Sequence, residues 1–264
     1  MRPLYFVKLG GSLITDKQRE ATARPALIRQ LAEELRQARL ARPELQVLLG
    51  HGSGSFGHWE AQRYHTRAGV SGAEAWTGFA RVGAAAARLN RLVTDTFINA
   101  GVPVVSLPPS TAAITEEGRV VSYSLEPLER ALSAGLVPMV FGDVVFDRAR
   151  GGGILSTEDV FVYLAQQLQP QAIILLANAL GVLDQQGRVI PEITPARFAD
   201  IEPALGGSSG VDVTGGMRDK VLQMLHLIQL LPELHVWILS GRVPGILFRA
   251  LTGNLTEGTH LHAD

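Results

Sequence analysis

The sequence contains no cysteine, which excludes disulfide bonds and zinc sites built from thiolates. It has no apolar run long enough to cross a bilayer, and its first residues lack the apolar core of a signal peptide. The formal net charge is −1, from 24 basic and 25 acidic residues, so no surplus of positive charge indicates a nucleic-acid or membrane partner. With 264 residues, 46% of them hydrophobic, we expect a soluble, cytoplasmic, globular protein.

Lysine is scarce. The 24 basic residues comprise 21 arginines and only three lysines, which are Lys8, Lys17 and Lys220. A compositional bias of the gene explains the arginines, but it does not explain why three lysines remain. An ammonium is a compact point charge on a flexible stem, whereas a guanidinium is a planar fork, so the two are not equivalent where a single oxygen must be reached. Each lysine is therefore a candidate functional residue.

Short apolar segments alternate with amphipathic ones along the chain. The pattern predicts strands at residues 4–9, 45–49, 102–107, 136–141, 172–176 and 235–239. It predicts helices at residues 25–40, 73–100 (as one helix or two), 159–168 and 217–231, and hairpins at residues 117–118 and 182–190. This alternation favours an α/β fold with a mostly parallel sheet covered by helices on both faces. Ligands then bind at the carboxyl ends of the strands.

Glycine-rich turns lie where these strands end. Gly10-Gly11-Ser12 follows the first strand, Gly52-Ser53-Gly54-Ser55 the second, and Gly142-Asp143 the fourth, while residues 213–217 open a helix. Glycine lets the backbone approach an anion closely, and a helix N-terminus offers unpaired N–H groups. Several such turns at one edge of a sheet indicate a ligand that carries more than one phosphate.

The spacing Gly52-x-Gly54-x-x-Gly57 after an apolar run also matches the dinucleotide-binding fingerprint. That fingerprint requires a long helix and then a strand that ends in an acidic residue roughly 20 residues further on. Here Gly69 and Gly72 interrupt the helix, and Glu74 begins the next helix instead of ending a strand. A nicotinamide or flavin cofactor is therefore not predicted, and the P-loop pattern is absent as well.

A set of ordered motifs resembles the amino acid kinase superfamily. Residues 8–12 (KLGGS), with Lys17 shortly after them, are similar to its opening, and residues 51–58 (HGSGSFGH) look like the second loop of its isopentenyl phosphate kinase branch. Further similar blocks follow in the same order at residues 142–145, 155–159, 212–220, 243–245 and 257–259. The resemblance spans nearly the whole chain, and all three lysines fall inside these motifs.

The resemblance implies a three-layer αβα sandwich that forms a single domain over residues 1–264. Within it, residues 1–170 would bind the phosphate acceptor and residues 171–264 would bind ATP. The implied reaction is transfer of the ATP γ-phosphate to isopentenyl phosphate, which gives isopentenyl diphosphate and ADP. By the same resemblance a homodimer is expected.

Roles for individual residues follow from the resemblance. Five would be catalytic: Lys8 bridging to the transferred phosphate, Lys17 stabilising its transition state, Lys220 holding the ATP phosphates, Asp159 orienting the ammonium groups, and His58 bonding the acceptor phosphate. Contacts to ATP are expected from Lys8, Gly10, Gly11, Ser12, Gly54, Asn178, Gly215, Gly216 and Lys220. Contacts to the acceptor are expected from Gly52, Ser53, His58 and Thr157. Mg²⁺ would arrive with ATP, held mainly by phosphate oxygens and water instead of a metal site of the protein.

The sequence departs from the family pattern at three positions. Ala177-Asn178 stands where relatives usually carry Thr-Asp, Ser53 replaces a common glycine, and Thr157 stands where glycine is usual. The asparagine lacks a charge and so affects the expected nucleotide contacts, while the serine and threonine reshape the seat of the acceptor. None of these changes removes a lysine.

Other interpretations stay open. The chain could phosphorylate another small phosphate or phosphonate, such as a fosfomycin-like acceptor, or it could be a catalytically silent nucleotide-binding protein on the same fold. Lys17 could be a solvated loop charge, and His58 could pack locally. His51, His58 and His65 recur every seven residues, but without an HExxH pattern or carboxylate partners they do not predict a metal site. The side chains of Tyr64, Trp76, Phe79 and Val82 could line an isoprenoid pocket or simply belong to the core.

Overall fold

An eight-stranded sheet runs through the computed structural model, which describes residues 2–204 and 216–263. Strand β1 (Leu4–Leu9) lies at its centre. On one side of β1 follow β2 (Gln46–His51), β6 (Val137–Phe141) and β3 (Val104–Ser106), and on the other β9 (Ala172–Ala177), β11 (His235–Ser240), β12 (Thr259–Leu261) and β10 (Glu192–Ile193). All neighbouring pairs are parallel except β11 and β12. The predicted α/β class with a mostly parallel sheet is confirmed.

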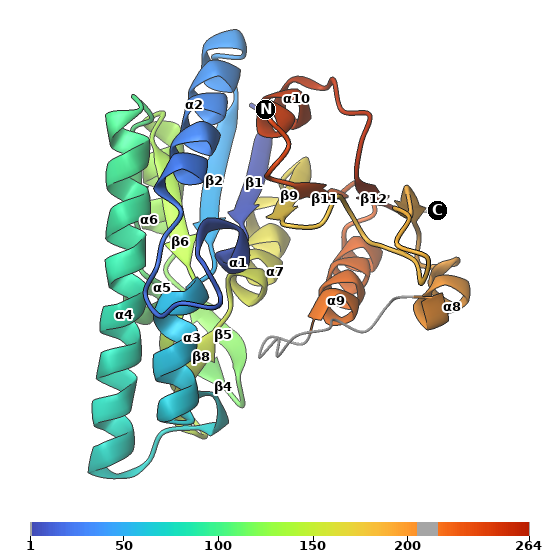
Figure 1. Cartoon of the computed structure of the whole chain (residues 1–264). Helices are drawn as coiled ribbons and strands as arrows, with labels where there is room; N and C mark the ends of the chain where they lie inside the picture. Colours follow the sequence, from blue (N-terminus) through green and yellow to red (C-terminus); the bar gives the residue numbers. More distant parts are fainter. Residues whose placement is uncertain (1, 205–215, 264) are drawn as a thin grey trace.

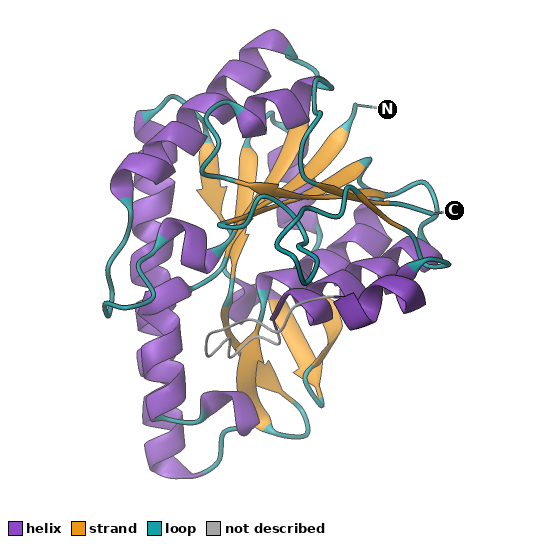
Figure 2. Ribbon diagram, turned by 45° about the vertical axis from the view of Figure 1, so that its right-hand side comes forward, coloured by secondary structure: helices purple, strands orange, loops and turns teal. Residues whose placement is uncertain are grey.

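Helices cover both faces of this sheet (Figures 1 and 2). One face packs against α2 (Pro25–Ala41), α4 (Gly72–Asn99) and α10 (Ile246–Thr252), and the other against α6 (Glu126–Ser133), α7 (Thr157–Leu168) and α9 (Gly216–Leu230). Successive side chains of a strand point to opposite faces. Accordingly, Val7 and Leu9 of β1 belong to the first apolar cluster and Phe6 to the second. Burial on both faces explains why the strands are almost continuously apolar.

A second sheet of four strands extends the molecule beyond the carboxyl end of β6. Its order is β5 (Arg119–Tyr123), β4 (Ala113–Glu116), β7 (Asp143–Asp147) and β8 (Gly151–Leu155). Only Gly142 separates β6 from β7, so the chain leaves one sheet and enters the other at a single residue. The predicted hairpin at Glu117-Gly118 is confirmed, since β4 and β5 are antiparallel and both turn residues have positive φ.

Other short elements complete the described chain: α1 (Gly11–Ile14), α3 (Gly54–Arg63), the 3-10 helix at Thr66–Ala68, α5 (Pro109–Ala112), α8 (Phe198–Ile201) and the 3-10 helix at Glu202–Ala204. The segment predicted as one helix or two is the single helix α4. A 3-10 helix and α4 follow α3, with no strand before β3, which is not the order that a dinucleotide fold requires.

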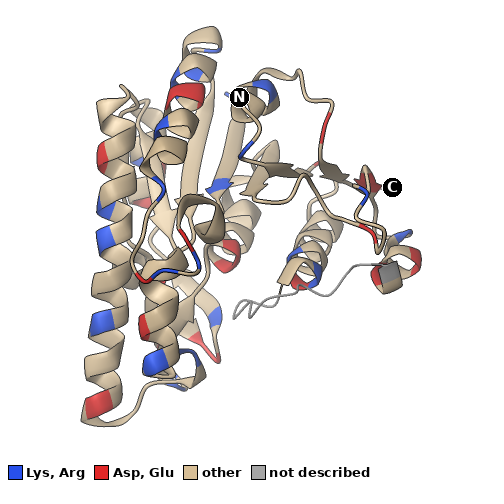
Figure 3. Ribbon diagram, in the orientation of Figure 1, with Lys and Arg blue, Asp and Glu red and all other residues tan. Residues whose placement is uncertain are grey.

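Charge is mixed over the surface. Figure 3 shows acidic and basic residues interspersed along α2 and α4, in keeping with the net charge of −1. Within residues 2–204 and 216–263, no helix combines the length and the apolar character that crossing a membrane requires.

Glu34 of α2 is a buried carboxylate that holds α10 in place. Its two oxygens accept hydrogen bonds from the backbone N–H groups of Gly245 (2.8 Å) and Leu247 (2.9 Å), which lie at the N-terminus of α10. Helix N-termini have unpaired N–H groups, and an acidic partner satisfies them. A side chain of one helix thus caps another that lies more than 200 residues further along the chain.

We expect Glu34→Ala to lower the free energy of unfolding by about 1–3 kcal/mol, because buried N–H groups of α10 lose their acceptor. Chemical denaturation of the two proteins measures this difference. The matched control is Glu33→Ala, one residue earlier on the same helix, where the carboxylate pairs with Arg36 at the surface. An unfolding curve for Glu34→Ala that coincides with that of the control would contradict the capping role.

Candidate active site

The three lysines of the chain line one pocket at the carboxyl ends of the central strands. Lys8 lies near the end of β1, Lys17 follows α1, and Lys220 lies in the first turns of α9. The side chain of Lys8 is buried, that of Lys220 is about one quarter exposed, and Lys17 is exposed at the rim. The structure therefore brings together three cations that lie far apart in the sequence. Lys8 and Lys220, for example, are 212 positions apart.

Two glycine turns meet backbone to backbone at the edge of this pocket. A Cβ atom on Gly11 would lie 2.7 Å from the Gly54 nitrogen, and a Cβ on Gly54, where φ is +51°, would lie 2.3 Å from Thr15 Oγ1. Only glycine fits at such an approach. The Thr15 hydroxyl locks the contact, since it donates to the Gly11 carbonyl (2.7 Å) and accepts from the Ser55 N–H (3.0 Å). The turns after β1 and β2 consequently form one surface.

This surface presents unused hydrogen-bond donors. Among the described residues, the backbone N–H groups of Gly11, Ser12, Ser53 and Gly54 have no acceptor, and all four residues line the pocket. Backbone N–H groups that converge on a concave surface form a seat for anions. Together with the lysines, they make the pocket suited to phosphate groups.

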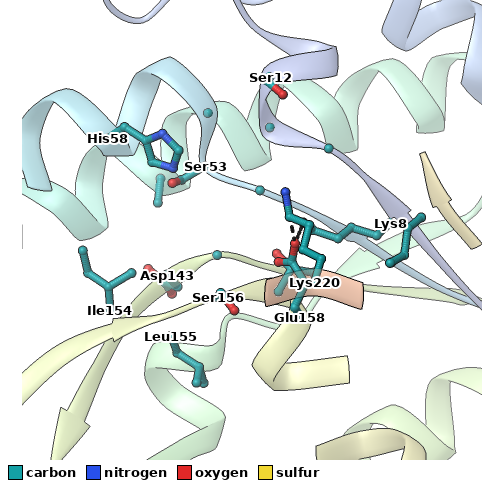
Figure 4. A pocket seen from close by; sticks show the side chains of 18 of the residues that line it. Lys8, Ser12, Ser53, His58, Asp143, Ile154, Leu155, Ser156, Glu158 and Lys220 are labelled. Carbon is teal, nitrogen blue, oxygen red and sulfur yellow. Dashed lines mark hydrogen bonds and ion pairs between the residues drawn. The ribbon is translucent and has the colours of Figure 1, made fainter. Parts of the chain in front are cut away.

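Glu158 lies between two of the lysines. Its Oε1 atom accepts a hydrogen bond from Lys8 Nζ and lies 4.0 Å from Lys220 Nζ (Figure 4). Burial alone would raise the pKa of Glu158, but the positive charges of Lys8 and Lys220 outweigh burial, and the pKa is lowered. The carboxylate thus remains ionised inside the pocket and holds both ammonium groups near it.

The orientation of the ammonium groups by Asp159 stays a prediction, and the structure shows a local role for this residue. Asp159 closes a capping box with Ser156 at the start of α7, and its other oxygen accepts from Gln223 Nε2 (2.7 Å). Its neighbour Glu158 contacts the lysines instead. The sequence contains the signal for this exchange, because Ser156-x-x-Asp159 matches the capping pattern and assigns the aspartate to the helix end.

The expected acceptor residues lie on one side of the pocket. Gly52, Ser53 and His58 line it, with Ser53 and His58 neighbouring one another in Figure 4. Apolar residues continue this wall, and these are Ala61, Val82, Ala86, Ile154 and Leu155. Of the aromatic candidates, Trp76 and Phe79 pack with Phe146 and do not line the pocket, although Phe79 shares an apolar cluster with wall residues such as Val82.

Thr157 and Asn178 use their polar groups within the protein. The buried Thr157 lines the pocket, but its hydroxyl donates to the His51 carbonyl (2.7 Å). Asn178 does not line the pocket; its amide donates to the Ser12 carbonyl (2.8 Å) and accepts from Arg242 Nε (2.8 Å). Its contact with ATP stays a prediction.

The remaining ATP candidates are placed in part. Gly10, Gly11 and Ser12 line the pocket, and Gly216 begins α9 with a positive φ. Gly215 lies outside the described residues.

Asp143 is a further pocket residue that sequence reasoning did not single out. It lines the pocket, and burial raises the pKa of this carboxyl, although the backbone N–H groups of Ser110 (3.2 Å) and Val144 (2.9 Å) donate to it. The signal was present, because Gly142-Asp143 is one of the motifs that end a strand.

Comparisons with known proteins show which family the chain matches and which relatives it is similar to. The amino acid kinase family matches residues 3–239. An isopentenyl phosphate kinase of Haloferax volcanii is 38% identical over 224 residues, which cover 85% of this chain and 88% of the relative. One of Methanothermobacter thermautotrophicus is 30% identical over 270 residues, covering 98% of each chain. An X-ray structure of an isopentenyl phosphate kinase, 27% identical, matches with a TM-score of 0.81 and covers 98% of this chain and 99% of its own.

We expect Glu158→Gln to lower the free energy of unfolding at pH 7 by about 3 kcal/mol, because a buried ion pair loses one partner. Because the folded-state pKa of Glu158 is lowered, its charge stabilises the fold at pH values above the ordinary pKa of 4.5. That stabilisation is lost as the pH falls through the lowered pKa. The difference between parent and variant should therefore shrink below about pH 4.5 in denaturation curves measured at several pH values.

Asp159→Asn is the matched control for this measurement. It weakens a helix cap, at a cost of about 1 kcal/mol, and leaves the lysines their partner. Equal losses for the two variants, or a difference at Glu158 that does not change with pH, would show that Glu158 carries no special charge interaction.

Proposed function

Since the chain belongs to the amino acid kinase family, we propose that it transfers the γ-phosphate of ATP to isopentenyl phosphate. The products are isopentenyl diphosphate and ADP. The observation that carries this proposal is the convergence of all three lysines on one pocket whose rim is made of two glycine turns. The isopentenyl phosphate kinases that the chain resembles over nearly its full length support the choice of acceptor.

Phosphoryl transfer between two phosphorylated ligands is limited mainly by charge. The acceptor is already an anion near neutral pH, so no general base is needed to activate it. The protein must instead align the two ligands and offset their repulsion. Two like charges about 4 Å apart repel by roughly 4 kcal/mol at an effective dielectric constant near 20. Ammonium groups and backbone N–H groups fixed in the pocket supply the compensating positive charge.

The described residues divide into two sides of this pocket. On the acceptor side, His58 and Ser53 would hold the phosphate, and the apolar wall that includes Val82 and Ile154 would hold the five-carbon tail. This side is built from residues before position 170. On the other side Lys220, with the start of α9, would hold the ATP phosphates.

Lys8 lies between these two sides and would reach the transferred phosphate. Glu158 would act as a positioning residue that keeps Lys8 and Lys220 directed into the pocket until ATP arrives. Lys17, at the rim, would stabilise the charge that develops on the moving phosphoryl group.

Magnesium would enter with ATP and neutralise phosphate charge. Among the described residues, no group of three or more metal-ligating side chains converges. Phosphate oxygens and water would supply most of its ligands, which suits the coordination that Mg²⁺ prefers. The homodimer also remains part of this proposal, on the strength of the family resemblance, and the cytoplasmic location remains part of it on the strength of the composition.

A coupled assay of ADP release with a panel of acceptors tests the function. We expect isopentenyl phosphate to give much the highest kcat/KM, ahead of a shorter alkyl phosphate and of fosfomycin. A preference for fosfomycin would favour the phosphonate alternative. ATP binding without ADP release for every acceptor would favour the catalytically silent protein.

We expect Lys17→Ala to reduce kcat by two or more orders of magnitude, because it removes an ammonium group that acts on the transition state, while the Kd of ATP changes little. Steady-state kinetics and nucleotide titration measure the two quantities. Arg19→Ala, an exposed cation in the same loop, is the control and should behave like the parent. Unchanged turnover in Lys17→Ala would identify Lys17 as a solvated loop charge.

A further inference from the structure

His51 is the last residue of β2 and directly precedes the turn that lines the acceptor side. It is fully buried, its ring stacks on Phe141 with 5.5 Å between centroids, and it does not line the pocket. No catalytic step above uses it. A buried polar side chain in such a place needs hydrogen-bond partners, and those partners show what it holds.

Both ring nitrogens of His51 face polar atoms. Nδ1 lies 3.1 Å from the carbonyl oxygen of Gly52, and Nε2 lies 3.2 Å from the side-chain oxygen of Asn90 in α4. The Asn90 amide in turn lies 2.6 Å from Ser106 Oγ. A carbonyl can only accept, so Nδ1 must carry a proton and donate to Gly52.

Burial lowers the pKa of His51, and the nearby charge of Lys8 acts in the same direction. The ring is therefore neutral near pH 7, with its single proton on Nδ1. A neutral ring leaves Nε2 as an acceptor, and the Asn90 amide satisfies it when its NH₂ group faces the ring and its oxygen faces the Ser106 hydroxyl. Each contact in the series of hydrogen bonds from Ser106 through Asn90 and His51 to Gly52 then joins a donor to an acceptor.

The backbone of His51 makes two further connections. Its carbonyl accepts from the Thr157 hydroxyl (2.7 Å) and from the Gly142 N–H (2.9 Å). Through its ring and its carbonyl, His51 thus joins the acceptor turn to α4, to the start of α7 and to the junction of the two sheets. No other contact described above ties that turn to so many elements.

The bond from His51 to Gly52 also fixes a donor of the acceptor seat. The peptide between Gly52 and Ser53 is planar and trans, so its C=O and N–H groups point in opposite directions. Holding the Gly52 carbonyl against the imidazole therefore sets the direction of the Ser53 N–H. That N–H has no acceptor among the described residues, and Ser53 lines the pocket.

We propose that His51 is a positioning residue for the acceptor, which acts by holding the Gly52–Ser53 peptide so that the Ser53 N–H can bind the acceptor phosphate. The inference rests on the proposed function, since it names the backbone donor whose direction governs acceptor binding. His58 touches the acceptor in that scheme, whereas His51 acts only through the turn.

Three substitutions separate the two ring contacts. His51→Phe keeps the stacking on Phe141 and removes both hydrogen bonds. His51→Asn places an amide nitrogen near the position of Nδ1 and keeps the bond to Gly52, whereas the longer side chain of His51→Gln reaches toward Asn90 and not toward Gly52. His65→Asn is the matched control, because His65 is exposed and its positive φ of 49° suits asparagine.

We expect His51→Phe to raise the KM for isopentenyl phosphate at least tenfold, with the KM for ATP within about twofold of the parent's. His51→Asn should stay within about threefold of the parent for both substrates, and His65→Asn should be unchanged. Should His51→Phe not fold, the proposal requires a higher acceptor KM for His51→Gln than for His51→Asn. If His51 only stabilised the fold, His51→Phe would lower the melting temperature and the active fraction. It would not raise the KM for isopentenyl phosphate more than the KM for ATP.

Two results would overturn the inference. One is an acceptor KM for His51→Phe within twofold of the parent's, and the other is an equal rise for His51→Asn and His51→Phe. A parent that does not turn over isopentenyl phosphate counts against the proposed function instead. The Kd of isopentenyl phosphate, measured by calorimetry for the same variants, then decides the role of His51, and a parent that does not bind it would overturn the inference as well.

Discussion

One buried carboxylate makes the pocket possible. Lys8 and Lys220 approach each other from β1 and α9, and without an anion between them their charges would repel. Glu158 compensates for one of the two charges and leaves the pocket with a net positive charge that a phosphate can use. The carboxylate is close enough to hold both ammonium groups. Because it lines the pocket, a bound phosphate can contact the same ammonium groups. A phosphate that binds there meets ammonium groups that Glu158 already holds in place.

Parallel strand order explains why distant residues meet at this point. Strands β9, β1, β2 and β6 are neighbours and all end at the same edge, so the residues that follow them share one rim. The close approach of Gly11 to Gly54 then turns two separate loops into one surface. The sheet places the two loops side by side. Because these glycines have no side chains, the backbones of the loops can then touch.

The predictable part of the molecule is the part whose signal is local or compositional. The long strands and helices have clear periodicity, and the rarity of lysine pointed to the three residues that line the pocket. Where two adjacent residues have similar side chains, the sequence does not show which of the two side chains faces the pocket. Glu158 and Asp159 are adjacent carboxylates on one helix, and only the capping bond to Ser156 decides which of them faces the lysines. Strand β8, rich in glycine, has little strand propensity of its own, and its pairing with β7 forms it.

Two of the three positions expected to depart from the family pattern, Thr157 and Ser53, lie opposite glycines. The methyl group of Thr157 lies 2.6 Å from where a Cβ on Gly50 would stand, and Ser53 Cβ lies 2.6 Å from where a Cβ on Gly57 would stand. Each added side chain therefore occupies space that a glycine opposite it leaves open. Both residues also line the pocket, so their side chains contribute to its wall as well. The three lysines reach the pocket from other elements, so neither side chain takes the place of a cation there.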